Sequence, residues 1–104
     1  MVTLRRTVAF GDWLETLCDA RARAAVARRI GRLREGNFGD TKPVGDGVSE
    51  MRIDFGPGNR ICFCRRGPVL IILLCGGDKG SQARDIVRAK ELALSWSLEA
   101  DNTP

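Results

Sequence analysis

The 104-residue chain is predicted to be an α+β protein with the element order β-α-α-β-β-β-α, an antiparallel sheet with an N-terminal helical hairpin on one face and a C-terminal helix. Two observations predict this class. Apolar residues recur at helical spacing near both ends of the chain, which predicts helices, and in the middle of the chain they alternate or form short runs, which predicts strands. The composition, 43% hydrophobic and 29% charged, is typical of a globular protein. We expect one domain, residues 1–98, followed by a short tail, residues 99–104.

A short strand at residues 2–6 is expected to lead into two helices. Thr7 can cap the first helix, whose apolar residues have helical spacing: Phe10, Trp13, Leu14 and Leu17. The second helix, residues 20–34, has apolar residues on one side and a stripe of arginines on the other: Arg21, Arg28 and Arg32. Such a stripe is most often a solvated helix face, and less often a surface for ribosomal RNA, DNA or an acidic partner.

The middle of the chain is predicted to form a loop and three strands. Residues 36–47 carry four glycines and a proline among polar residues, which favours a loop. Apolar stretches separated by glycine-proline turns then predict an antiparallel meander of strands: 49–55, 60–64 and 69–75. A final helix is expected over residues 81–98, with Ser81 as its N-cap.

The register of the first hairpin is predicted from burial, because its apolar residues then share one face. The expected pairs are Ile53 with Ile61, Met51 with Phe63, Asp54 with Arg60, and Arg52 with Cys62. Arg52 and Arg60 then emerge on the face turned away from the first two helices, with Cα atoms about 8 Å apart, and a phosphate fits between them. The alternative is a pair of salt bridges, Arg60 with Asp54 and Arg52 with Glu50.

The third strand of the meander is expected to add apolar surface beside these arginines. Its residues on that face, by alternation, are Val69, Ile71, Leu73 and Cys75. We expect the C-terminal helix or a partner to cover this surface, since exposed apolar patches of that size are rare in globular proteins.

Residues 75–82, CGGDKGSQ, place glycines, a lysine and a helix N-terminus at the end of a strand. Free backbone N–H groups converge at such a point and suit anions. The alternative is that the glycines simply make the turn from strand to helix. The GxxxxGK[ST] spacing is absent, so nucleotide hydrolysis has no support.

The composition favours a polyanionic partner over a metal. Seventeen basic against thirteen acidic residues give a net charge of +4, and arginine, whose planar fork suits phosphate, greatly outnumbers lysine. The cysteines lack zinc-site spacing and there is no histidine, so we expect reduced structural thiols and neither metal nor cofactor. No apolar run is long enough to cross a bilayer and the N-terminus lacks a secretory signal, so we expect a cytoplasmic protein without membrane contact.

Several segments together resemble a known family: FGDWLETLCDARARAAVARRIGRLREGNFGD, KPVGDGVSEMRIDFGPGNR and LLCGGDKGSQARDIVRAKELA. They are similar to the HigB-like addiction-module killer proteins of the RelE/ParE toxin superfamily, over about residues 1–96. The resemblance implies a RelE-like fold and a bacterial type II toxin that pairs with a cognate antitoxin, typically a helix-turn-helix protein. It also implies a ribosome-dependent endoribonuclease that cuts mRNA, whereas a minority branch of the superfamily poisons DNA gyrase.

The family pattern matches this chain at the following positions: Lys42, Glu50, Arg52, Arg60, Asp78, Lys79 and Gln82. The resemblance implies RNA or phosphate contacts for all of them except Glu50. It implies a catalytic role for four of them: Glu50, Arg52, Arg60 and Lys79. Relatives commonly read GPGYRVYF where this chain reads GPGNRICF, so Asn59 and Cys62 stand in place of two tyrosines.

RNA cleavage without a metal needs a base for the 2′-OH, stabilisation of the charged phosphorane, and an acid for the leaving oxygen. The chain contains no histidine or tyrosine to move these protons. Arg52 and Arg60 suit the phosphorane, and Lys79 and Glu50 are alternative bases. The rival interpretation is a non-enzymatic toxin or binding module, either a gyrase inhibitor or a catalytically weakened antitoxin-binding protein. An antitoxin segment laid across the arginines would inhibit by occlusion.

Overall fold

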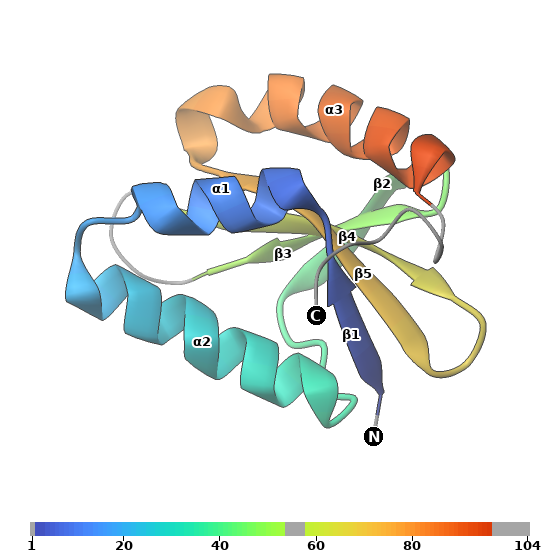
Figure 1. Cartoon of the computed structure of the whole chain (residues 1–104), viewed down its shortest axis with the longest axis horizontal. Helices are drawn as coiled ribbons and strands as arrows, with labels where there is room; N and C mark the ends of the chain where they lie inside the picture. Colours follow the sequence, from blue (N-terminus) through green and yellow to red (C-terminus); the bar gives the residue numbers. More distant parts are fainter. Residues whose placement is uncertain (1, 54–57, 97–104) are drawn as a thin grey trace.

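The computed structural model describes residues 2–53 and 58–96 (Figure 1). Its elements follow in this order: β1 (Thr3–Arg6), α1 (Val8–Thr16), α2 (Ala20–Arg34), β2 (Thr41–Gly45), β3 (Val48–Arg52), β4 (Arg60–Arg66), β5 (Leu70–Gly77), the 3-10 turn η1 (Lys79–Ser81) and α3 (Gln82–Ser95). The predicted α+β class is confirmed. The expected boundary at residue 98 and the tail beyond it lie outside the described residues.

The sheet has five strands in the order β1-β5-β4-β3-β2. The predicted antiparallel meander of β3, β4 and β5 is confirmed. The prediction of a wholly antiparallel sheet is wrong, because β1 pairs with β5 in parallel, with Thr3 beside Leu70. This pairing joins two strands that are far apart in the sequence, with both helices of the N-terminal half and three strands between them, so no local signal predicts it.

The predicted loop at residues 36–47 is wrong over its second half, where β2 forms a hairpin with β3. Asp46 and Gly47 make the turn with φ of 56° and 76°, the left-handed conformation that two-residue hairpins require. The Asp-Gly dipeptide was therefore the missed signal. Pro43 is tolerated because β2 lies at the edge of the sheet.

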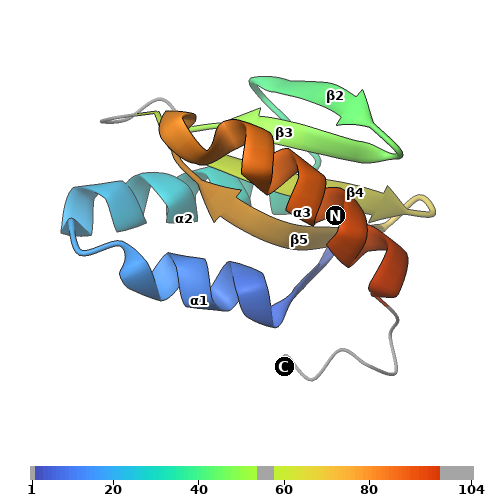
Figure 2. The same ribbon diagram turned by 90° about the horizontal axis from the view of Figure 1, so that it is seen from above.

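Helices cover both faces of the sheet (Figure 2). Residues of α1 and α2 pack with Met51, Ile61 and Ile71 in one buried cluster, and residues of α3 pack with Val48 and Ile72 in another. The expectation that α3 covers the face bearing Arg52 and Arg60 is thus confirmed.

The apolar residues of β5 divide between the two faces differently from the prediction. Ile71 and Leu73, expected beside the arginines, lie instead on the α1–α2 face. Cys75 lies on the α3 face, as expected. The cause is an irregularity between β4 and β5: Phe63 pairs with Leu73 while its neighbour Cys62 pairs with Cys75, which leaves Leu74 as an extra residue.

The register between β3 and β4 is shifted by two residues from the predicted one. Met51 pairs with Ile61 and Arg52 pairs with Arg60, and the Ile53 N–H donates to the Asn59 carbonyl at 2.8 Å. Because a two-residue shift leaves every side chain on its own face, burial cannot distinguish these registers. Residues 54–57 lie outside the described residues, and with them the predicted pair of Asp54 with Arg60.

Both predicted helix starts can be tested against the structure. The Thr7 cap is confirmed, since its hydroxyl accepts a hydrogen bond from the Phe10 N–H at 3.0 Å. Ser81 makes no side-chain cap for α3; instead Asp78 caps the η1 turn that precedes it.

Across the described part of the chain, none of the helices combines the length and apolar character needed to cross a bilayer.

Candidate functional site

The two arginines at the centre of the predicted site are direct neighbours. Arg52 ends β3 and Arg60 begins β4, and the two are register partners on the face that α3 covers. Their surroundings differ, because the Arg52 side chain is 53% exposed whereas that of Arg60 is only 12% exposed. Arg52 is thus open to a ligand, whereas Arg60 is engaged inside the protein.

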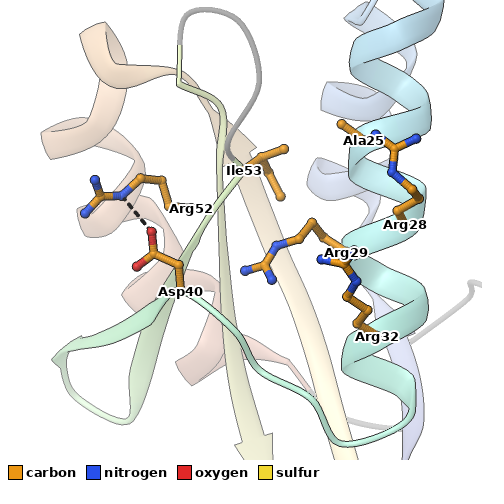
Figure 3. Close-up of a pocket in the computed structure, with 7 residues that line it drawn as sticks. All are labelled: Ala25, Arg28, Arg29, Arg32, Asp40, Arg52 and Ile53. Atoms are coloured by element: carbon orange, nitrogen blue, oxygen red, sulfur yellow. Dashed lines mark ion pairs between the residues drawn. The ribbon is translucent and has the colours of Figure 1, made fainter.

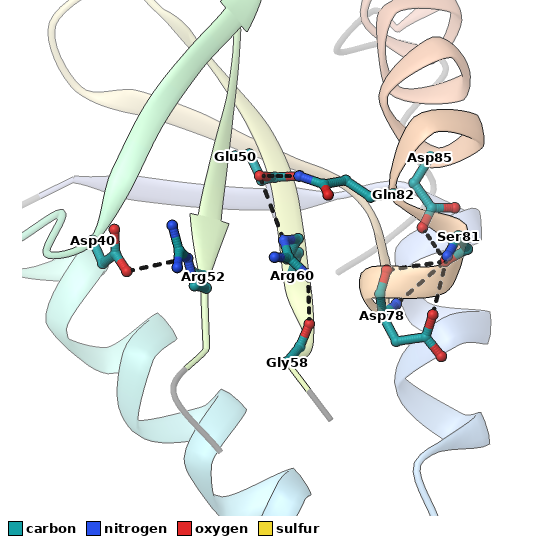
Figure 4. Close-up of polar contacts among 9 residues, drawn as sticks. All are labelled: Asp40, Glu50, Arg52, Gly58, Arg60, Asp78, Ser81, Gln82 and Asp85. Carbon is teal, nitrogen blue, oxygen red and sulfur yellow. Dashed lines mark hydrogen bonds and ion pairs between the residues drawn. The ribbon is translucent and has the colours of Figure 1, made fainter. Parts of the chain in front are cut away.

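Arg60 belongs to a buried polar group that we call the Glu50 cluster: Glu50, Arg60 and Gln82 (Figure 4). The Gln82 amide nitrogen donates to both Glu50 carboxylate oxygens, at 2.9 and 3.1 Å. Arg60 Nε lies 3.6 Å from Glu50 Oε1, and its Nη1 donates to the Gly58 carbonyl at 2.9 Å. The cluster ties β3, β4 and α3 together and fixes the orientation of the Arg60 guanidinium.

Glu50 is only 4% exposed, which bears on its predicted role as a base. A buried carboxylate is stable only when it is paired and hydrogen-bonded, as this one is. Both of its oxygens already accept hydrogen bonds from Gln82. This arrangement favours a positioning role for Glu50 over direct proton transfer from RNA.

Arg52 pairs with an acid that the sequence did not single out. Its Nε lies 3.4 Å from the carboxylate of Asp40, and its backbone N–H donates to the Asp40 carbonyl at 2.9 Å. Of the two predicted salt bridges, Arg52 with Glu50 is wrong, because Arg52 pairs with Asp40 and Glu50 pairs with Arg60. The other, Arg60 with Asp54, involves a residue outside the described part of the chain. Asp40 escaped notice because it lies within the stretch predicted to be a loop.

The glycines of the CGGDKGSQ segment have packing roles. A Cβ on Gly76 would lie 2.3 Å from the Trp13 ring, and one on Gly77 would lie 1.9 Å from a carboxylate oxygen of Asp85. The backbone N–H groups of Asp78 and Ser81 bond to each other's side chains, at 3.2 and 3.1 Å. The N–H groups of Asp78 and Ser81 are thus already used within the turn, and Gly76 and Gly77 serve the close packing of β5 against Trp13 and Asp85.

Lys79 and Lys42 are both exposed and come from opposite sides of the Glu50 cluster. Lys79 lies in η1, two residues after Gly77, which is the register partner of Arg60. Lys42 lies in β2 and is the register partner of Glu50. The topology thus brings both lysines toward the strands that carry the arginines.

The arginine stripe of α2 divides into two parts. Arg28 and Arg32 line an open pocket that also includes Arg52, whereas Arg21 is not among its lining residues and lies 3.8 Å from Asp19 at the start of the helix. Arg29, which helical periodicity did not single out, lines the same pocket. Its guanidinium packs against Gly39, a contact made by the fold that no local pattern predicts.

Three of the cysteines lie inside the sheet on the α3 side. Cys62 and Cys75 are register partners of β4 and β5 and, like Cys64, are buried. A hydrogen bond with Cys75, reinforced by burial, raises the pKa of the Cys62 thiol, and burial raises the pKa of Cys64. Within residues 2–53 and 58–96, no group of three or more Cys, Asp or Glu side chains is placed to hold a metal ion.

The protein is thus a small α+β protein with a five-stranded mixed sheet, helices on both faces and an arginine pair beside a buried carboxylate. No protein-family model matches the chain. The chain is 49% identical over 97 residues to a Haemophilus influenzae protein described as uncharacterized. The aligned region covers 93% of this chain and 98% of that protein. The chain belongs to the same family as that protein.

Proposed function

We propose that this chain is the toxin of a bacterial type II toxin–antitoxin module, a HigB-like member of the RelE/ParE superfamily that cleaves mRNA on the ribosome. The observation that carries the proposal is the register pairing of Arg52 with Arg60, on the face that also holds Glu50. Two guanidinium groups side by side suit a phosphodiester, whose negative charge grows as the phosphorane forms. The α+β architecture, a five-stranded mixed sheet with helices on both faces, is compatible with the RelE-like fold that this proposal requires.

In this mechanism the 2′-OH of one nucleotide gives up its proton and attacks the adjacent phosphorus, and the bond to the 5′-oxygen breaks. That oxygen takes up a proton and leaves as a 5′-hydroxyl, and a 2′,3′-cyclic phosphate remains. Arg52, the exposed member of the pair, contacts the phosphate directly. Arg60 is held in place by Glu50 and supplies a fixed positive charge beside it. Lys79 is the remaining candidate for proton transfer, because it is exposed and follows the strand paired with Arg60.

The ribosome completes this site by holding the mRNA in the geometry for in-line attack, since orientation alone accelerates such reactions by orders of magnitude. The protein then acts in the cytoplasm. Its antitoxin neutralises it by occupying the surface around Arg52. The apolar residues on this face are already covered by α3, so the antitoxin recognises mainly the charged rim.

Mapping of mRNA 5′ ends by primer extension in cells that express the protein tests the proposal. Wild type is expected to produce new ends within translated regions, and Arg52→Ala is expected to reduce their yield about 100-fold, the cost of removing one phosphorane donor. Lys79→Ala is expected to reduce the yield while leaving the fold intact, because its side chain is exposed. Arg88→Ala, an exposed arginine of α3, is the matched control.

Failure of wild type to produce new mRNA ends while growth still stops overturns the nuclease proposal. The alternative, a non-enzymatic toxin such as a gyrase inhibitor, has one observation in its favour: Arg60 is engaged by Glu50 and nearly buried, which leaves one open arginine of the pair. Accumulation of cleaved chromosomal DNA in the same cells, instead of cleaved mRNA, establishes that alternative.

A further inference from the structure

The structure contains a second cationic feature beside the Glu50 cluster, which we call the arginine pocket. It is an open pocket of about 540 Å³ between α2 and the end of β3. Its charged lining residues are Arg28, Arg29, Arg32, Arg52 and Asp40 (Figure 3). Four arginines and one aspartate therefore line a volume comparable to that of a small-ligand site, with Arg52 and Asp40 on the β3 side and the other three arginines on α2 (Figure 3).

Arg29 is fixed within this pocket by the backbone. It extends from α2 toward the end of β3, where Asp40 and Arg52 lie (Figure 3). Its Nη2 donates to the Phe38 carbonyl at 3.3 Å, and a Cβ on Gly39 would lie 2.1 Å from its Nη1. Gly39 also has a φ of +62°, a backbone conformation that favours glycine, and any side chain here would displace the Arg29 guanidinium. The chain is thus shaped to admit this guanidinium.

Asp40 leaves the arginine pocket strongly positive. Its carboxylate is 64% exposed and lies 3.4 Å from Arg52 Nε, and such exposed pairs are weak and screened by salt. Arg28 and Arg32 are exposed and lie one helical turn apart on the same side of α2. Like charges gathered around one pocket repel each other, and an anion bound among them relieves this repulsion.

We infer that the arginine pocket is a phosphate-binding subsite that holds the sugar-phosphate backbone of a single RNA strand next to the proposed cleavage site. This inference rests on the proposed function. Arg52 connects the two features, since it lines the pocket and is also the register partner of Arg60. A strand whose scissile phosphate contacts Arg52 therefore has its neighbouring phosphates within reach of Arg28, Arg29 and Arg32 on α2.

Binding of a short fluorescein-labelled oligoribonucleotide with 2′-O-methyl groups, followed by fluorescence anisotropy, tests the inference without any cleavage. Arg28→Ala and Arg32→Ala are expected to weaken binding about fivefold each and to lower the salt slope of log K by about 0.7 per contact. Arg88→Ala is the matched control. The substituted residues are exposed helix positions, where alanine maintains the helix, and thermal unfolding checks that each variant is folded.

Two results overturn the inference. One is RNA binding by Arg28→Ala and Arg32→Ala that equals binding by Arg88→Ala. The other is displacement of the RNA by poly-L-glutamate as effectively as by unlabelled RNA of equal charge, because the pocket then binds acidic peptides. The nuclease proposal can fail separately from this inference. If RNA binding depends on the pocket arginines but no new mRNA ends appear in cells, only the cleavage proposal is overturned. If new ends appear but binding does not depend on these arginines, only the subsite is overturned.

Discussion

At the scale of single residues, the Glu50 cluster connects stability with function. Its carboxylate is 4% exposed and is compensated by Gln82 from α3 and Arg60 from β4. Removing one partner from a buried ion pair leaves the other charge without compensation, which costs more than the intact pair contributes. The cluster therefore couples the orientation of Arg60 to the docking of α3 on the sheet.

We expect Arg60→Ala to lower the free energy of unfolding by about 3 kcal/mol, because Glu50 is left charged and buried with only Gln82 as a partner. Adding Glu50→Gln to Arg60→Ala is expected to recover part of this loss, because it removes the uncompensated charge. Urea unfolding measures both. Arg88→Ala is expected to stay within about 0.5 kcal/mol of wild type. Equal stability of Arg60→Ala and wild type would contradict the role of the cluster.

Gly76 provides a second residue-scale prediction, because the Trp13 ring lies where its Cβ would be, at 2.3 Å. Gly76→Ala is expected to lower the free energy of unfolding by about 2 kcal/mol, because the added methyl group displaces that ring from the sheet. Thermal unfolding measures the loss, and tryptophan fluorescence reports the movement of the ring. If the reason is steric, the same change in a Trp13→Leu background costs much less; an equal cost in both backgrounds contradicts it.

At the scale of elements, the start of α1 is held to the sheet by one side chain. The Thr7 hydroxyl accepts from the Phe10 N–H at 3.0 Å and donates to the Leu74 carbonyl at 2.5 Å. Thr7 thus caps the helix and also fixes the position of α1 relative to β5. The capping role is local and could be predicted, whereas the bond to Leu74 joins residues that are distant in the sequence.

Replacing this hydroxyl by a methyl group of the same shape, in Thr7→Val, is expected to lower the free energy of unfolding by about 2 kcal/mol, because a cap and a buried carbonyl partner are lost together. Thr7→Ser retains both hydrogen bonds and is the control, with an expected loss well below that of Thr7→Val. Denaturant unfolding of wild type and of the two variants measures both losses in the free energy of unfolding. The assigned role is wrong if serine and valine cost the same.

At the scale of the whole molecule, the sheet is buried on both faces, and this burial controls the chemistry of its cysteines. Cys18 is exposed, whereas Cys62, Cys64 and Cys75 lie inside the sheet beneath α3. Cys62 and Cys64 have a raised pKa, and a protonated thiol is a poor nucleophile. The hydrogen bond with Cys62 lowers the pKa of Cys75, so burial alone protects that thiol. Their reaction with a reagent therefore requires the fold to open.

A colorimetric disulfide reagent releases one coloured thiolate for each cysteine that reacts with it. With an excess of this reagent, Cys18 of the native protein is expected to react rapidly, and the three buried cysteines at the rate of unfolding. All four cysteines react rapidly in denaturant. Cys18→Ser is expected to abolish the rapid phase and leave the slow one unchanged. A second rapid equivalent from the native protein would show that α3 does not protect the sheet.

Local patterns could predict most elements of this protein. The periodicity of residues 20–34 gives the bounds of α2, and alternation identifies β3, because each local pattern depends on residues close in sequence. The Asp46-Gly47 turn was also predictable, since both residues have the left-handed conformation that this dipeptide favours. The sequence by itself therefore determined the α+β class and the sheet face that carries Arg52 and Arg60.

Only the tertiary structure decided how these parts meet. The pairing of Arg52 with Arg60, instead of with Cys62, and the parallel pairing of β1 with β5 depend on contacts between distant segments. Gln82 meets Glu50, 32 residues away, and the arginines of α2 meet Arg52 only after both helix and strand have packed. Local patterns specify which face a side chain takes, whereas its partner on that face depends on packing across the whole chain.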